Sequence, residues 1–133
     1  MSRSQQQIEP RADFDEAHIK SEMAIIEKRF PQERQKMRDA VLALGKKEAM
    51  AHLAITFRQP ELLNSEQARA YLQKAVDEEK KLTEADKEAL VTLEVQAERI
   101  AYDLAKFDCD TSSKHYEKLA PQLSYLQSEM KLT

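Results

Sequence analysis

The stretch from Leu82 to Phe107 constrains the fold more than any other part of the sequence. Its apolar residues follow one another at spacings of three and four: Leu90, Leu93, Ala97, Ile100, Leu104 and Phe107. Residues spaced in this way lie on one face of an α-helix. Thr83 can cap the start of this helix together with Asp86, and no Gly or Pro interrupts it. We therefore expect a long helix whose apolar face the rest of the chain covers.

The composition favours helices throughout the chain. The 133 residues include one Gly and four Pro, and Glu, Lys, Gln, Ala and Leu, which dominate, are all good helix formers. Charged residues make up 34% of the chain and hydrophobic residues 41%, which suits helices with one buried and one solvated face. The predicted fold class is all-α, as a single-domain helical bundle of four to five amphipathic helices.

Polar segments and prolines mark the ends of the first predicted helix. Residues 1–12 are polar and predict a flexible N-terminal tail, so the helical bundle domain is assigned to residues 13–133. Asp13 can cap the first helix, and Pro31 is expected to end it, because the residue before a proline avoids the helical conformation. The apolar stripe of this helix consists of Ile19, Met23, Ile26 and Phe30.

Three further helices are expected besides the first and the organising one. The second covers residues 32–57, preferably as one helix through Gly45, although two helices that meet at Gly45 stay an alternative. Asn64 or Ser65 can cap the third helix. Residues 108–113 are polar and predict a break before the last helix, in which Pro121 is expected to cause a kink. The apolar stripe of the last helix consists of Tyr116, Leu119, Leu123, Leu126 and Met130.

Charge is distributed unevenly along the chain. Residues 28–47 have seven basic and two acidic side chains, a net charge of +5, whereas residues 61–103 have a net charge of -5. The candidate partner-binding residues are the basic ones: Lys28, Arg29, Arg34, Lys36, Arg38, Lys46 and Lys47. An acidic protein or a phosphate backbone would suit them. The structural alternative is that these charges pair with the acidic helices of the same chain.

Nucleic acid is the weaker of these two partners, because the net charge of the whole chain is -3. No Phe, Tyr or Trp lies between Pro31 and Thr56 to stack on bases, and no helix-turn-helix turn is recognisable. No window is apolar enough to span a bilayer, and the first residues do not resemble a secretory signal. A single cysteine excludes an internal disulfide. Together these features predict a cytoplasmic protein without a membrane partner.

The sequence contains no recognisable catalytic or cofactor motif. One glycine excludes Gly-rich phosphate loops. His18 with Glu22 and Glu48 with His52 share helix faces, but their spacing does not match a dinuclear carboxylate site or a zinc site. Cys109 lies between Asp108 and Asp110, whose negative charges raise a thiol pKa and make a poor nucleophile. We expect no metal, no cofactor and no enzymatic activity. An enzyme built from Arg, Glu and Gln on inward helix faces would show no motif and stays a third alternative.

These observations favour a small non-enzymatic protein-binding module: an adaptor, chaperone, inhibitor or regulatory subunit that acts through a helical surface. The partner is another protein, and the heptad-like stripes also suit self-association into a homodimer. The expected contact surface is the basic second helix with its nearby apolar residues. The alternative function is a nucleic-acid-associated regulator that uses the same basic helix, residues 28–47.

Overall fold

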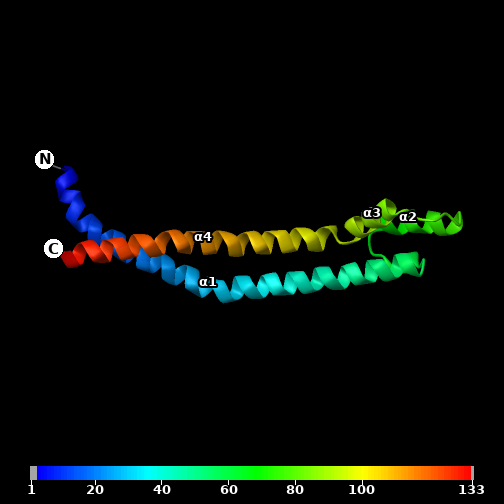
Figure 1. Cartoon of the computed structure of the whole chain (residues 1–133), viewed down its shortest axis with the longest axis horizontal. Helices are drawn as coiled ribbons and strands as arrows, with labels where there is room; N and C mark the ends of the chain where they lie inside the picture. The colour runs from blue at the N-terminus through cyan, green and yellow to red at the C-terminus, as the bar shows by residue number, and fades with distance from the viewer. Residues whose placement is uncertain (1–2, 133) are drawn as a thin grey trace. The chain divides into compact units, whose positions relative to one another are not determined.

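The computed structural model describes the backbone of residues 3–132 and the side chains of residues 16–129. This part of the chain contains four α-helices and no strand, so the predicted all-α class is confirmed. None of these helices combines the length and the apolar composition needed to cross a bilayer. The elements in chain order are α1 (Arg3–Thr56), the short 3₁₀ helix η1 (Pro60–Leu62), α2 (Glu66–Asp77), α3 (Glu84–Glu94) and α4 (Gln96–Leu132) (Figure 1).

The chain divides into two compact units. Unit 1 combines Met1–Gln35 with Phe107–Thr133, and unit 2 is the continuous segment Lys36–Lys106. Helices α1 and α4 each contribute residues to both units. The expected single bundle domain over residues 13–133 stays a prediction.

Helix α1 is longer than the sequence predicts. It begins at Arg3 rather than at Asp13, and it continues through Pro31 and Gly45. A proline inside a helix costs about 3 kcal/mol, and packing of neighbouring residues can offset this cost. Phe30, the residue before Pro31, packs against Tyr116 of α4, with their ring centres 5.7 Å apart. The expectation of one helix through Gly45 is confirmed. The flexibility expected of residues 1–12 stays a prediction, and the first two residues lie outside the described part.

Helix α4 contradicts the break predicted at residues 108–113, because it is helical from Gln96 to Leu132 and passes through Pro121 as well. Ser112 is only 7% exposed, and its hydroxyl donates a hydrogen bond to Glu33 Oε2 at 3.0 Å. Its polarity is therefore satisfied by α1 and does not require a loop. The break lies instead at Val95, inside the helix that the sequence predicts as continuous.

The predicted starts of the two short helices are confirmed. Ser65 caps α2, and its hydroxyl accepts a hydrogen bond from the Ala68 N–H at 3.3 Å. Thr83 and Asp86 form a complete capping box at the start of α3, in which each side chain accepts a hydrogen bond from the other residue's N–H at 3.1 Å. Such caps satisfy N–H groups that the first turn of a helix leaves without a helical partner.

Each unit has an apolar core of its own. In unit 1, Ile19 and Ile26 of α1 are buried with Leu119 of α4. Residues that pack against them come from the two stripes predicted at the ends of the chain: Met23, Phe30, Tyr116, Leu123 and Leu126. In unit 2, the core combines the end of α1 with the helices that follow: Ala51, Ala54, Ile55, Leu63, Ala68, Leu72, Ala75, Leu82 and Leu90.

Arg58 closes unit 2 where α1 ends. Its backbone has a φ of 53°, a left-handed conformation that reverses the chain after the helix at some steric cost to a residue with a side chain. Its guanidinium donates hydrogen bonds to the carbonyl oxygens of Ala75 at 2.8 Å and Lys80 at 3.0 Å. These acceptors include the end of α2, so one side chain ties the end of α1 to the end of α2.

Candidate protein-binding surface

In unit 2, helix α1 carries apolar residues on two opposite sides. Ala51 and Ile55 are buried in the core. Leu53 lies two residues from each of them, about 200° around the helix axis, and it is 44% exposed. Leu42 lies on the same outward side and is 67% exposed. The α1 outer stripe is defined as the residues at spacings of four, three and four on this side: Leu42, Lys46, Ala49 and Leu53.

Helix α4 has a corresponding outward side. Glu98 marks the side that faces α1, since its carboxylate forms an ion pair with Lys47 Nζ at 3.0 Å. Ile100 lies two residues further, about 200° around the axis, and is 53% exposed. Leu104 follows one turn later and is 60% exposed. The α4 outer stripe is defined as Ala97, Ile100 and Leu104.

The α4 outer stripe corrects a prediction from the sequence. The stripe from Leu90 to Phe107 was expected to face the core throughout, but only its beginning does: Leu90 is buried, whereas Phe107 is exposed together with Ile100 and Leu104. Helix α3 ends at Glu94 and α4 begins at Gln96. The buried positions in the described part of α4 are different from the predicted ones and are spaced at seven: Ala105, Ser112 and Leu119.

The seven basic residues proposed from the sequence do not belong to one unit. Lys28, Arg29 and Arg34 belong to unit 1, and Lys36, Arg38, Lys46 and Lys47 belong to unit 2. Six of the seven are exposed, and Lys47 is half-buried. The Arg34 guanidinium lies 5.4 Å from the centre of the Phe30 ring, at a distance that allows a cation–π contact.

Part of this basic segment pairs inside the chain, as the structural alternative anticipated. Lys47 Nζ lies 3.0 Å from Glu98 Oε1, and Arg99 of α4 lies 3.6 Å from Glu48 of α1. Both ion pairs link α1 to α4. Helix α1 supplies the cation in the first pair and the carboxylate in the second. Lys47 therefore supports the packing of unit 2, whereas Arg38 and Lys46 project from its surface.

Charges flank the two outer stripes with opposite signs. Leu42 has the basic Arg38 and Lys46 at four residues on either side and the acidic Asp39 three residues before it, and residues at these spacings are neighbours on a helix surface. Ile100 has the exposed Asp103 as its neighbour at three residues. The surroundings of Leu42 are therefore net basic, with Lys46 inside the α1 outer stripe itself, and the α4 outer stripe has an acidic neighbour.

A groove of about 700 Å³ lies beside the α1 outer stripe in unit 2. Lys46 and Ala49 of that stripe line it, with the half-exposed Met50 next to them. The remaining wall mixes apolar and charged groups: Ala43, Lys47, Glu61, Leu62, Asn64, Glu94 and Glu98. A partner that covers the stripe would therefore also find apolar and charged groups beside it.

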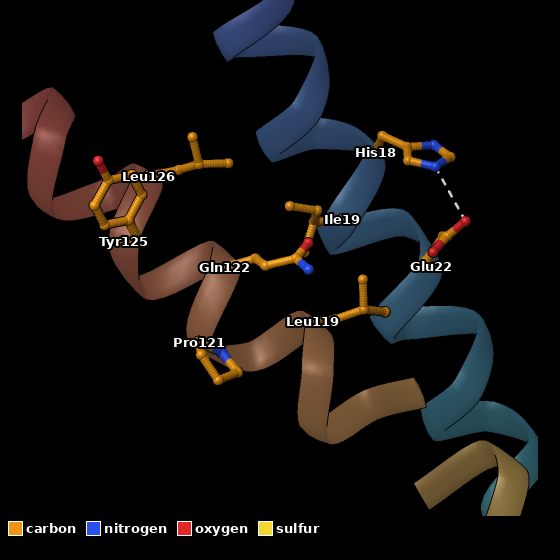
Figure 2. A pocket seen from close by; sticks show the side chains of 8 residues that line it. All are labelled: His18, Ile19, Glu22, Leu119, Pro121, Gln122, Tyr125 and Leu126. Atoms are coloured by element: carbon orange, nitrogen blue, oxygen red, sulfur yellow. Dashed lines mark ion pairs between the residues drawn. The ribbon is translucent and has the colours of Figure 1, made fainter. Parts of the chain in front are cut away.

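Unit 1 contains a second groove of about 700 Å³ between α1 and α4 (Figure 2). Ile19 and Leu119 extend into the space between the two helices, and Pro121 lies on the α4 side. The Glu22 carboxylate, at its edge, lies 3.0 Å from His18 Nε2 and 3.3 Å from His115 Nε2. The His18–Glu22 pair anticipated from spacing is therefore present, and α4 adds a second imidazole to it.

The described residues contain no cluster for a metal ion, and the one cysteine has a raised pKa. No group of three or more His, Cys, Asp or Glu side chains there could hold a metal ion. Burial raises the pKa of the Cys109 thiol, followed by the negative charges of Glu33, Asp110 and Asp108. The direction matches the expectation from the flanking aspartates, while burial and Glu33 are contributions that the local sequence does not reveal.

No protein-family model, curated protein or solved structure matches the chain significantly. Sequence spacing contains a signal for the α1 outer stripe, because Leu42, Ala49 and Leu53 are seven and four residues apart. The same helix also contains the buried set with Ala51 and Ile55, so the spacing does not tell which side faces water.

Proposed function

We propose that this chain is a non-enzymatic protein-binding module that binds its partner through the outer sides of α1 and α4. The observation that carries the proposal is the exposure of Leu42, Leu53, Ile100 and Leu104 opposite the buried sides of their helices. Removal of apolar surface from water contributes about 25 cal/mol per Å². Exposed apolar residues that share one helix side, as Leu42 does with Leu53 and Ile100 with Leu104, are typical of interaction surfaces, whereas scattered ones need no explanation.

The basic residues complete the proposed surface. Arg38 and Lys46 flank Leu42 and would attract acidic groups of a partner, which raises the association rate more than the affinity. Lys36 adds positive charge to α1 within unit 2, whereas Lys28, Arg29 and Arg34 belong to unit 1 and are not part of this surface. Lys47 is assigned to the packing of unit 2, because it pairs with Glu98.

The test is affinity capture of the tagged chain from its native lysate, with and without nuclease. Two sets of variants are compared with wild type: Leu42→Gln with Leu53→Gln, and the charge reversal of Arg38 and Lys46 to Glu. We expect protein partners that survive nuclease and are lost with both sets. Ile25→Gln is the matched control, since Ile25 is a half-exposed apolar residue of α1 outside the outer stripe.

Two results would contradict this function. Partner capture that both sets of variants leave unchanged would remove the outer sides of the helices as the contact surface. Capture that disappears with nuclease, and that weakens steeply between about 50 and 200 mM salt, would instead support the nucleic-acid-associated regulator, because phosphate contacts release counterions.

A further inference from the structure

We infer that the α1 outer stripe of one copy of this chain binds the α4 outer stripe of a second copy. The inference rests on the proposed function and names its partner. Both stripes lie on helices of unit 2 that continue without a break through them. Each combines large apolar residues with a small one, Ala49 in α1 and Ala97 at the start of the α4 stripe, and a small side chain permits close approach of two helices.

Charge selects this pairing over the pairing of identical stripes. Contact between two α1 outer stripes would bring the basic residues Arg38 and Lys46 of one copy toward those of the other. Contact between α1 and α4 outer stripes brings these residues toward Asp103 of the second copy instead. Like charges at an interface oppose association and opposite charges favour it. The same asymmetry exists within unit 2, where residues 36–47 have four basic side chains and one acidic side chain, whereas residues 61–103 have a net charge of -5.

The positions of the stripes determine the kind of assembly. Leu53 lies opposite the buried Ala51, and Ile100 lies opposite Glu98, whose carboxylate contacts Lys47 of α1. The two stripes therefore point away from the contact between α1 and α4 within unit 2. A second copy that covers one stripe leaves the other stripe free for a third copy. Such a contact is heterologous and generates rings or open chains larger than a dimer.

The test measures mass against concentration by sedimentation velocity for the full chain and two variants. The first variant carries Leu42→Gln with Leu53→Gln, and the second carries Ile100→Gln with Leu104→Gln. We expect wild type to form species larger than a dimer as its concentration rises, and each variant to stay monomeric. An equimolar mixture of the two variants should form a one-to-one dimer and nothing larger, because each retains one intact stripe.

Far-UV circular dichroism and a urea midpoint verify that the variants fold, since surface substitutions usually change stability by less than about 0.5 kcal/mol. Charge provides a second pair of variants. Asp103→Lys should weaken association at least about tenfold, and added Arg38→Glu with Lys46→Glu should restore it. Ile25→Gln is again the control and should associate like wild type.

Three outcomes would overturn the inference. One is a wild type that stays monomeric at all concentrations up to about 1 mM, because the dissociation constant would then be too high for specific assembly. Another is dimerisation of the variant with an altered α4 stripe, since this would show α1 stripes that pair with each other. The third is a mixture of the two variants that stays monomeric. The capture experiment can still succeed in each case, so the protein-binding function and its proposed partner are judged separately.

Discussion

The buried carboxylate of Glu94 accepts a hydrogen bond from the backbone N–H of Asn64 at 2.7 Å, across thirty residues of sequence. The same carboxylate accepts a second hydrogen bond, from the N–H of Ser65 at 2.8 Å. Helix α3 ends at Glu94, and α2 begins directly after Ser65. One side chain thus fixes the start of α2 at the point where the long predicted helix is interrupted.

Replacement of Glu94 should destabilise unit 2. Glu94→Ala leaves two backbone N–H groups without their acceptor, and we expect the free energy of unfolding to fall by about 2–3 kcal/mol. Glu94→Gln keeps one acceptor oxygen, so its free energy of unfolding should fall by less. Urea denaturation measures both values. Glu88→Ala, at an exposed position of α3, is the control and should stay within about 0.5 kcal/mol of wild type. An unchanged Glu94→Ala variant would contradict this role.

Gly45 offers a stabilising substitution. It lies inside α1, its φ is not positive, and a Cβ atom added there would meet nothing within 4 Å. Gly45→Ala should therefore raise the free energy of unfolding by about 0.5–1 kcal/mol, because alanine loses less backbone freedom on folding. The reverse substitution at a nearby exposed position, Ala43→Gly, should lower it by a similar amount. A loss of stability in Gly45→Ala would show that the glycine has a packing role.

The capping box of α3 should make stability depend on pH. The pKa of Asp86 is lowered by the hydrogen bonds that its carboxylate accepts, first from the Thr83 N–H and then from the Tyr71 hydroxyl. Its contribution is therefore present above its ordinary pKa of about 3.9 and is lost as the pH falls through the lower folded value. Between pH 7 and pH 3, the melting temperature of wild type should decrease more than that of Asp86→Asn. Parallel curves for the two proteins would contradict the assignment.

The hydrogen bond between Ser112 and Glu33 should appear as a coupling energy. Glu33 Oε1 is buried and accepts no hydrogen bond from the described residues. The other carboxylate oxygen, Oε2, accepts the hydrogen bond that the Ser112 hydroxyl donates. Ser112→Ala should cost about 1–2 kcal/mol. A double-mutant cycle with Glu33→Ala should give a coupling of about 1 kcal/mol. The exposed neighbour Ser113 provides the control substitution Ser113→Ala, for which no coupling to Glu33 is expected.

Cys109 should react slowly in the folded protein. Burial and the negative charges of Glu33, Asp110 and Asp108 raise its pKa, so less thiolate is present at a given pH. We expect the reaction with a disulfide reagent at pH 8 to be slower in the folded chain than in the chain unfolded in urea. Equal rates in the two states would show that neither burial nor charge protects this thiol.

The features that could be predicted from the sequence depend on residues close to one another in the chain. The caps at Ser65 and Thr83 use an acceptor and an N–H three residues apart, so their pattern is visible locally. The helix breaks were harder to predict because they depend on distant partners. Ser112 can lie inside a helix because its hydroxyl donates a hydrogen bond to Glu33, 79 residues away. Val95 interrupts the helix directly after Glu94, and the hydrogen-bond partners of Glu94 lie in another segment of the chain.

The candidate surface illustrates the same limit. The basic residues could be identified by composition, but their division between two units and the pairing of Lys47 with Glu98 could not. Periodicity found Ile100 and Leu104 yet assigned them to the core, because spacing alone does not tell which side of a helix is covered. Two apolar sets on α1 have equally good helical spacing, and only the packing of α2 and α3 decides that Ala51 is buried and Leu53 is not.

The composition of unit 1 from the two ends of the chain has a consequence during synthesis on the ribosome. Ile19 and Ile26 emerge early, whereas Leu119, which buries with them, is made about a hundred residues later. At a translation rate of about 5–20 residues per second, these two apolar side chains wait several seconds or more for their partner. Unit 2 can complete its core during that interval, because it is one continuous segment. The nascent N-terminal part of α1 is therefore the segment for which a chaperone would have the longest opportunity to bind.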